Sequence, residues 1–109
     1  MRRYVVYVSD RASADMEELH DYVARQLSAP GEAADLYDEL AARMLDLEIF
    51  PERFRLMDAG RGWPEGLRRM IVGKYHVLFV VEGERVIITN VLHSASDFGR
   101  RILPRRSAG

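Results

Sequence analysis

The stretch GLRRMIVGKYHVLFVVEGERVIITNVLH, residues 66–93, decides the fold, because it holds three apolar runs separated by glycine-containing turns. The runs cover residues 66–72, 75–81 and 85–93, and they are rich in β-branched and aromatic side chains. Runs of this length, joined by such short connections, are typical of antiparallel strands. The sequence therefore predicts a three-stranded meander.

The first half of the chain predicts one strand and two helices. Tyr4–Val8 is an apolar run typical of a buried or centrally paired strand, and Ser9 and Asp10 can cap the helix after it. Pro30 suits the first turn of the second helix, and Pro51 ends that helix. Apolar side chains recur at helical spacing, namely Met16, Leu19, Val23 and Leu27, then Ala33, Leu36, Tyr37, Leu40, Met44 and Leu47. The solvent side is expected to carry mostly Asp15, Glu17, Glu18, Asp21 and Arg25.

The predicted order is β-α-α-β-β-β, with a possible short final helix capped by Ser94–Asp97. The two helices should form an antiparallel hairpin, and their apolar stripes need a covering layer. The meander supplies that layer, and Tyr4–Val8 joins it as a fourth strand. The predicted fold class is α+β, with two layers: an antiparallel sheet covered on one face by the helical hairpin. The opposite face of the sheet is expected to stay open to a macromolecular guest.

Length and composition indicate a single domain over residues 1–104, with a disordered tail over Arg105–Gly109. No apolar stretch approaches the roughly 18 residues of a membrane span, and no export signal is visible, so a cytoplasmic protein is expected. Without cysteine there is no thiolate metal site, and histidines at positions 20, 76 and 93 lack ligand spacing. Neither a metal nor another cofactor is therefore expected.

Charge is divided unequally between the two halves of the chain. Residues 1–52 contain five arginines and twelve acidic residues, a balance of −7, whereas residues 53–109 have a balance of +6. The asymmetry suggests one acidic and one basic face, although acidic solvent faces on two amphipathic helices explain it equally well. Neither helix is basic, which argues against a protein that reads DNA with a helix.

The element order, taken with several local motifs, resembles the RelE/ParE superfamily of toxins from bacterial type II toxin–antitoxin systems. The motifs are Ser9-Asp10 with Ala14-Asp15-Met16, Pro51, Gly66-Leu67-Arg68-Arg69, Tyr75-His76-Val77-Leu78-Phe79, and Val91-Leu92-His93 with Asp97. The resemblance covers the chain from Tyr4 to about Leu103. It implies a growth-arresting toxin, associated with plasmid stabilization and neutralised by a cognate antitoxin. Contacts with that partner are expected at Leu36, Leu40, Met44 and Trp63.

The superfamily contains two mechanisms, and the sequence leaves both open. ParE-like members poison DNA gyrase without chemistry of their own, whereas RelE-like members cleave mRNA in the ribosome without a metal. Such cleavage needs a base, an acid and a cation that stabilises the phosphorane. The candidates are Arg68, Arg69 and His93, with Lys74 and His76 as secondary candidates.

Strand alternation places Arg68 and Arg69 on opposite faces, so only one of them can line a pocket. His93 lies at a strand end, where it is either a catalytic group or a structural histidine. His76 stands where RelE-like enzymes commonly have an arginine, and Ser94–Ser96 lacks the arginine that such enzymes commonly carry after the last strand. Both differences remove a fixed positive charge that would bind phosphate. The sequence therefore favours gyrase inhibition, with the endoribonuclease as the alternative. An antitoxin-binding module without toxicity is a third possibility, so whether the chain is an enzyme stays open.

Overall fold

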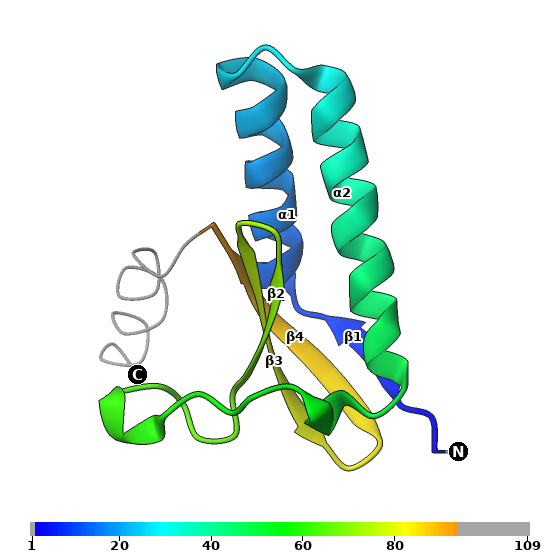
Figure 1. The fold of residues 1–109 in the computed structure, drawn as a ribbon, viewed down its shortest axis with the longest axis vertical. Helices are drawn as coiled ribbons and strands as arrows, with labels where there is room; N and C mark the ends of the chain where they lie inside the picture. Colours follow the sequence, from blue (N-terminus) through cyan, green and yellow to red (C-terminus); the bar gives the residue numbers. More distant parts are fainter. Residues whose placement is uncertain (1, 94–109) are drawn as a thin grey trace.

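The computed structural model describes residues 2–93, and its elements follow the predicted order (Figure 1). They are β1 (Val5–Val8), α1 (Asp10–Asp21), α2 (Pro30–Leu45), β2 (Arg68–Val72), β3 (Tyr75–Glu82) and β4 (Arg85–Leu92). A π-helical turn at Tyr22–Gln26 extends α1, and 3-10 turns occur at Asp46–Glu48, Pro51–Arg53 and Ala59–Arg61. The predicted final helix from Ser94 and the predicted tail Arg105–Gly109 lie outside the described residues.

The sheet has the strand order β1-β4-β3-β2. The meander β2-β3-β4 is antiparallel as predicted, but β1 pairs in parallel with β4, with Val5 opposite Arg85. The helical hairpin returns the chain to the end of the sheet where β1 starts. From there β2 runs in the direction of β1, β3 runs in the opposite direction, and β4 again runs in the direction of β1. The predicted fold class is confirmed, with β1 as a parallel edge strand in a mostly antiparallel sheet.

The hairpin of α1 and α2 begins where the sequence indicated. The Ser9 Oγ accepts a hydrogen bond from the Ala12 N–H at 3.0 Å, and Pro30 occupies the first turn of α2. Most of the predicted apolar stripe packs in the core against the sheet: Leu19 and Leu36 are half-buried there, and Met16, Leu40, Met44 and Leu47 are buried. Val23 and Ala33 are also buried, outside that core.

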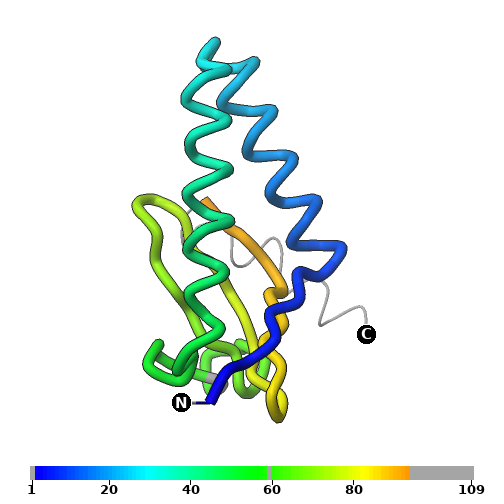
Figure 2. Tube along the Cα trace, turned by 90° about the vertical axis from the view of Figure 1, so that its right-hand side faces the viewer, coloured from blue at the N-terminus to red at the C-terminus, as the bar shows by residue number. Residues whose placement is uncertain are grey.

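Two stripe positions were predicted wrongly as buried. Leu27 is 57% exposed, because it lies in the connection at the tip of the hairpin, which extends past the sheet (Figure 1, Figure 2). Tyr37 is also exposed, and its ring lies edge-on against His20 of the other helix, with 6.2 Å between the ring centroids. Within residues 2–93, no helix combines the length and the apolar character that crossing a bilayer requires.

Asp15, expected on the solvent side, is only 3% exposed. Its carboxylate accepts a hydrogen bond from the Val91 N–H at 2.9 Å, which ties α1 to β4. Between β3 and β4 the register shifts at Leu78 and Phe79, so Thr89 is an extra residue on β4. This bulge lets Ile88 and Val91, which are an odd number of residues apart, both face the helices.

Two hydrophobic cores lie on opposite faces of the sheet. The larger core fills the space between the hairpin and the sheet and contains Leu40, Met70 and Phe79. The smaller core, made of Leu67, Leu78 and Leu92, lies on the face turned away from the helices, called the outer face below. Met57 and Trp63, from the connection between α2 and β2, pack on this second core together with Val80. The outer face is therefore partly covered, which corrects the expectation that it stays open.

The same connection also pairs with the outer edge of β2. The Met57 N–H donates to the Leu67 carbonyl at 2.7 Å, and the Arg69 N–H donates to the Arg55 carbonyl at 3.1 Å. These bonds occupy part of the edge of β2, so β1 is the more accessible edge of the sheet. Its outward side chains Val5 and Tyr7 are about half exposed, contrary to the buried strand that the sequence indicated.

Candidate functional site

Arg68 lies on the helix-facing side of β2, together with Met70 and Val72. Its guanidinium donates from Nη1 to the Glu52 carbonyl at 3.0 Å and to the Phe54 carbonyl at 2.7 Å. These bonds satisfy two backbone acceptors of the connection between α2 and β2. Arg68 therefore anchors that connection to the sheet, which leaves its charge poorly placed for a reacting phosphate.

Arg69 lies on the outer face, where His76 of β3 is its neighbour. Arg69 pairs with Leu78 and Ile71 pairs with His76, so the two side chains are diagonal neighbours, roughly 7–8 Å apart. Burial lowers the pKa of His76, and the nearby charges of Arg69 and His93 lower that pKa further. The imidazole therefore stays neutral to a lower pH than an ordinary histidine, beside a guanidinium that is always charged.

His93 follows the end of β4, where its side chain is exposed. Its ring lies 5.3 Å from the Tyr75 ring, measured between centroids. Burial raises the pKa of Tyr75, and nearby Tyr22 adds to that rise. Arg68 pairs with Phe79, four positions along β3 from Tyr75, so Arg68 and His93 are separated by about 13 Å along the sheet at ~3.3 Å per residue.

The structure thus places Arg69 and His76 together, with His93 near enough to affect the His76 pKa, and it separates Arg68 from His93. Lys74 lies in the exposed turn between β2 and β3. No set of three histidine, aspartate or glutamate side chains among residues 2–93 is arranged to hold a metal ion.

Comparison with known proteins establishes the family. The model of the ParE toxin of the type II toxin–antitoxin system parDE matches residues 6–98. The chain belongs to the ParE toxin family. No curated protein matches it.

Two solved structures show the same fold as this ParE-family chain. One is a chromosomal ParDE toxin–antitoxin system from P. aeruginosa, with a TM-score of 0.74 and 15% identity, covering 86% of this chain and 99% of that one. The other is the RelBE2 toxin–antitoxin complex from Mycobacterium tuberculosis, with a TM-score of 0.56 and 20% identity, covering 84% and 98% of the two chains. The superfamily resemblance drawn from the sequence motifs is confirmed.

The predicted partner contacts differ in their accessibility. Leu40 and Met44 lie in the core between the hairpin and the sheet, so no partner can reach them while the domain is folded. Leu36 and Trp63 are half-buried and remain the accessible members of this set. Leu40 and Met44 were predicted as partner contacts because they belong to the apolar stripe of the helix, and the same stripe packs into the core.

Sequence reasoning missed a hollow beside the start of β1. It has a volume of about 450 Å³ and is lined by Arg2, Tyr4, Ile49, Phe50 and Arg53. Phe50 has positive φ (47°), an uncommon backbone conformation for an aromatic residue. The only sequence signal was Pro51, which was read as a helix stop and gave no indication of the left-handed turn before it.

Proposed function

We propose that this chain is the growth-arresting toxin of a type II toxin–antitoxin pair, and that it inhibits DNA gyrase by binding and without chemistry of its own. The observation that carries the mechanism is the position of Arg68, whose guanidinium binds the Glu52 and Phe54 carbonyls far from His93. Cleavage requires a cation and an acid–base group to contact the same phosphate. Arg68 and His93 lie too far apart to do so. The match to the ParE toxin family over residues 6–98 supports the same mechanism.

A cognate antitoxin is the proposed regulatory partner. The two similar solved structures are a ParDE toxin–antitoxin system and a RelBE2 toxin–antitoxin complex. The accessible edge strand β1 and its half-exposed side chains Val5 and Tyr7 suit a partner that wraps the domain with an extended segment. Neutralisation then follows if the antitoxin covers the surface that gyrase contacts.

Purified protein should block the supercoiling of relaxed plasmid DNA by gyrase, and the antitoxin should restore it. Induction in cells should raise the number of DNA breaks while cellular transcripts stay whole. A supercoiling assay with increasing toxin, together with RNA sequencing after induction, measures both effects. Normal supercoiling at saturating toxin would exclude gyrase as the target.

Ribosome-dependent RNA cleavage is the second candidate, and the Arg69–His76 neighbourhood is the observation that favours it. A neutral His76 can take the proton of a 2′-hydroxyl, and Arg69 can stabilise the phosphorane charge. On the gyrase mechanism, the double variant Arg69→Gln with His76→Gln should arrest growth as the wild type does. The matched control is Arg61→Gln, which removes an exposed arginine that pairs with Asp58 at 3.8 Å.

Growth and transcript integrity after induction decide between the two candidates. The ribonuclease would be supported by two results: cleaved transcripts with the wild type, and a growth arrest that is lost in the double variant but kept in Arg61→Gln. Binding of the antitoxin by the double variant serves as the folding control. A double variant that binds antitoxin and still arrests growth supports gyrase inhibition.

A further inference from the structure

The hollow beside β1 is built by a short pairing between the two ends of the first half of the chain. The Tyr4 N–H donates to the Glu48 carbonyl at 2.8 Å, and Arg3 and Ile49 form an antiparallel bridge. These contacts hold Tyr4 next to the segment that leaves α2. The resulting volume of about 450 Å³ lies within the range of roughly 300–1,000 Å³ found for ligand pockets.

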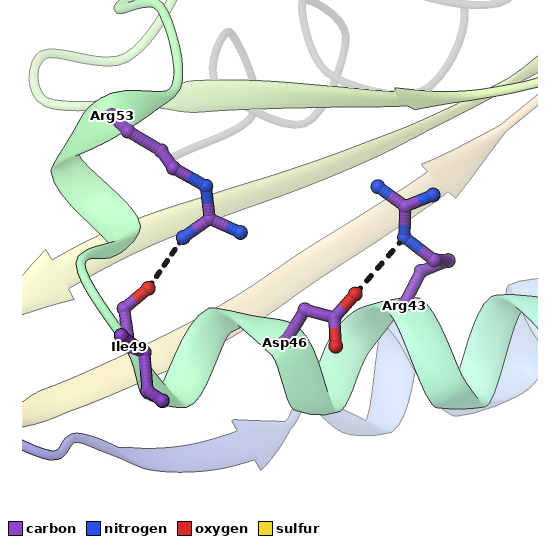
Figure 3. Close-up of polar contacts among 4 residues, drawn as sticks. All are labelled: Arg43, Asp46, Ile49 and Arg53. Carbon is purple, nitrogen blue, oxygen red and sulfur yellow. Dashed lines mark hydrogen bonds and ion pairs between the residues drawn. The ribbon is translucent and has the colours of Figure 1, made fainter.

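Phe50 presents an aromatic ring to this hollow from a fixed backbone. Its side chain is 61% exposed, and its backbone is left-handed, with φ 47° and ψ 57°. The guanidinium Nη1 of Arg53 donates to the Ile49 carbonyl (Figure 3). It also donates to the Phe50 carbonyl, at 3.0 Å. The ion pair between Arg43 and Asp46, 3.1 Å long, lies just before this turn (Figure 3). Strained backbone held by specific contacts is found at binding and switch sites, so the turn is suited to display the ring.

Two arginines complete the lining of the hollow. The Arg2 guanidinium lies 5.3 Å from the centroid of the Tyr4 ring, and the Arg53 guanidinium lies 4.5 Å from that of Phe54. Within the described part of the chain, neither guanidinium forms an ion pair with a carboxylate. A guanidinium so placed binds a carboxylate through two parallel hydrogen bonds.

Two acidic groups near the hollow are already engaged. The Glu48 carboxylate pairs with Arg3 at 3.6 Å, and the Glu52 carboxylate accepts a hydrogen bond from the Tyr4 hydroxyl at 3.1 Å. The hollow therefore combines apolar walls with two arginines that lack an internal carboxylate. That chemistry is complementary to an apolar side chain with an acidic group beside it.

We infer that this hollow binds a segment of the antitoxin that inserts an apolar side chain between Tyr4 and Phe50 and places a carboxylate on Arg2. The inference rests on the antitoxin pairing proposed above and adds where the partner is held and by which chemistry. A protein segment fits better than a nucleic acid, because the hollow adjoins β1, the more accessible edge of the sheet, with which an extended polypeptide can pair.

The test measures affinity for the purified antitoxin, the protein encoded by the reading frame beside this one, by isothermal titration calorimetry. Arg2→Glu and Phe50→Ser should each weaken binding by about tenfold or more, as expected when an anchor or its charge is lost. The matched controls are Arg25→Glu and Leu45→Ser, which alter an exposed arginine and an exposed leucine that do not line the hollow. Both controls should bind within about twofold of the wild type, because neither side chain contributes to the hollow.

Each outcome of this test decides something different. If the wild type does not bind the antitoxin, the proposed partner fails, and this inference fails with it. If the wild type binds and all four variants bind equally well, the hollow is not the site, although the antitoxin pairing stands. A labelled single-stranded RNA that binds the wild type and loses affinity in Arg2→Glu would make the hollow a nucleic-acid site and overturn the inference. Thermal unfolding of each variant verifies that the domain remains folded.

Discussion

Replacing Phe79 by alanine is expected to lower the free energy of unfolding by about 3–5 kcal/mol. Phe79 is fully buried in the core between the hairpin and the sheet, and its ring lies edge-on against Phe54 with 6.0 Å between centroids. The substitution removes buried apolar surface, leaves a cavity and loses the aromatic pair. Small domains are stable by only about 5–15 kcal/mol, so the variant should lose a large share of its stability.

Urea unfolding followed by circular dichroism measures this loss, and the growth arrest on induction should weaken in parallel. Ile71→Ala is the matched control, because Ile71 is a large apolar residue of the neighbouring strand β2 that is 54% exposed. Its cost should stay within roughly 0.5–1 kcal/mol. Equal losses in the two variants would mean that the hairpin does not pack on the sheet as described.

The arrangement of helices and strands was predictable because local chemistry specifies it. Ser9 offers an acceptor at a helix start, Pro30 fits only a first turn, and the glycine-containing turns divide the meander. These signals act within a few residues and do not depend on the rest of the fold. The direction of β1 was missed because it depends on which strand of the meander β1 pairs with, and the pairing with β4 joins segments that are distant in the sequence.

The candidate site was less predictable because its groups are positioned by contacts between distant segments. Strand alternation correctly placed Arg68 and Arg69 on opposite faces of the sheet. It could not indicate that the Arg68 guanidinium would donate hydrogen bonds to the Glu52 and Phe54 carbonyls. Likewise, the hollow at Phe50 depends on the bond between Tyr4 and Glu48, which no periodic pattern encodes.

Asp15→Ala is expected to lower the free energy of unfolding by about 2–3 kcal/mol, a large effect for a charged residue on a helix. The strand β4 continues past the end of β1 at Val8, so a β4 backbone donor there has no neighbouring strand to bind. The Asp15 carboxylate supplies the acceptor, taking the Val91 N–H at 2.9 Å. Without that carboxylate, a buried N–H is left unsatisfied, and one of the hydrogen bonds between α1 and β4 is lost.

The same unfolding measurement, made on three variants, separates this anchor from a general effect of charge. Glu17→Ala removes an exposed carboxylate from the same helix and should change stability by no more than about 0.5 kcal/mol. Asp15→Asn keeps an oxygen that can accept the Val91 N–H, so its loss should lie between those of the two alanine variants. Asp15→Ala unfolding at the same urea concentration as Glu17→Ala would show that the carboxylate does not hold α1 to β4. The hairpin would then be attached to the sheet by its apolar contacts and by the bonds of Ser9 to the Ile88 and Thr89 carbonyls.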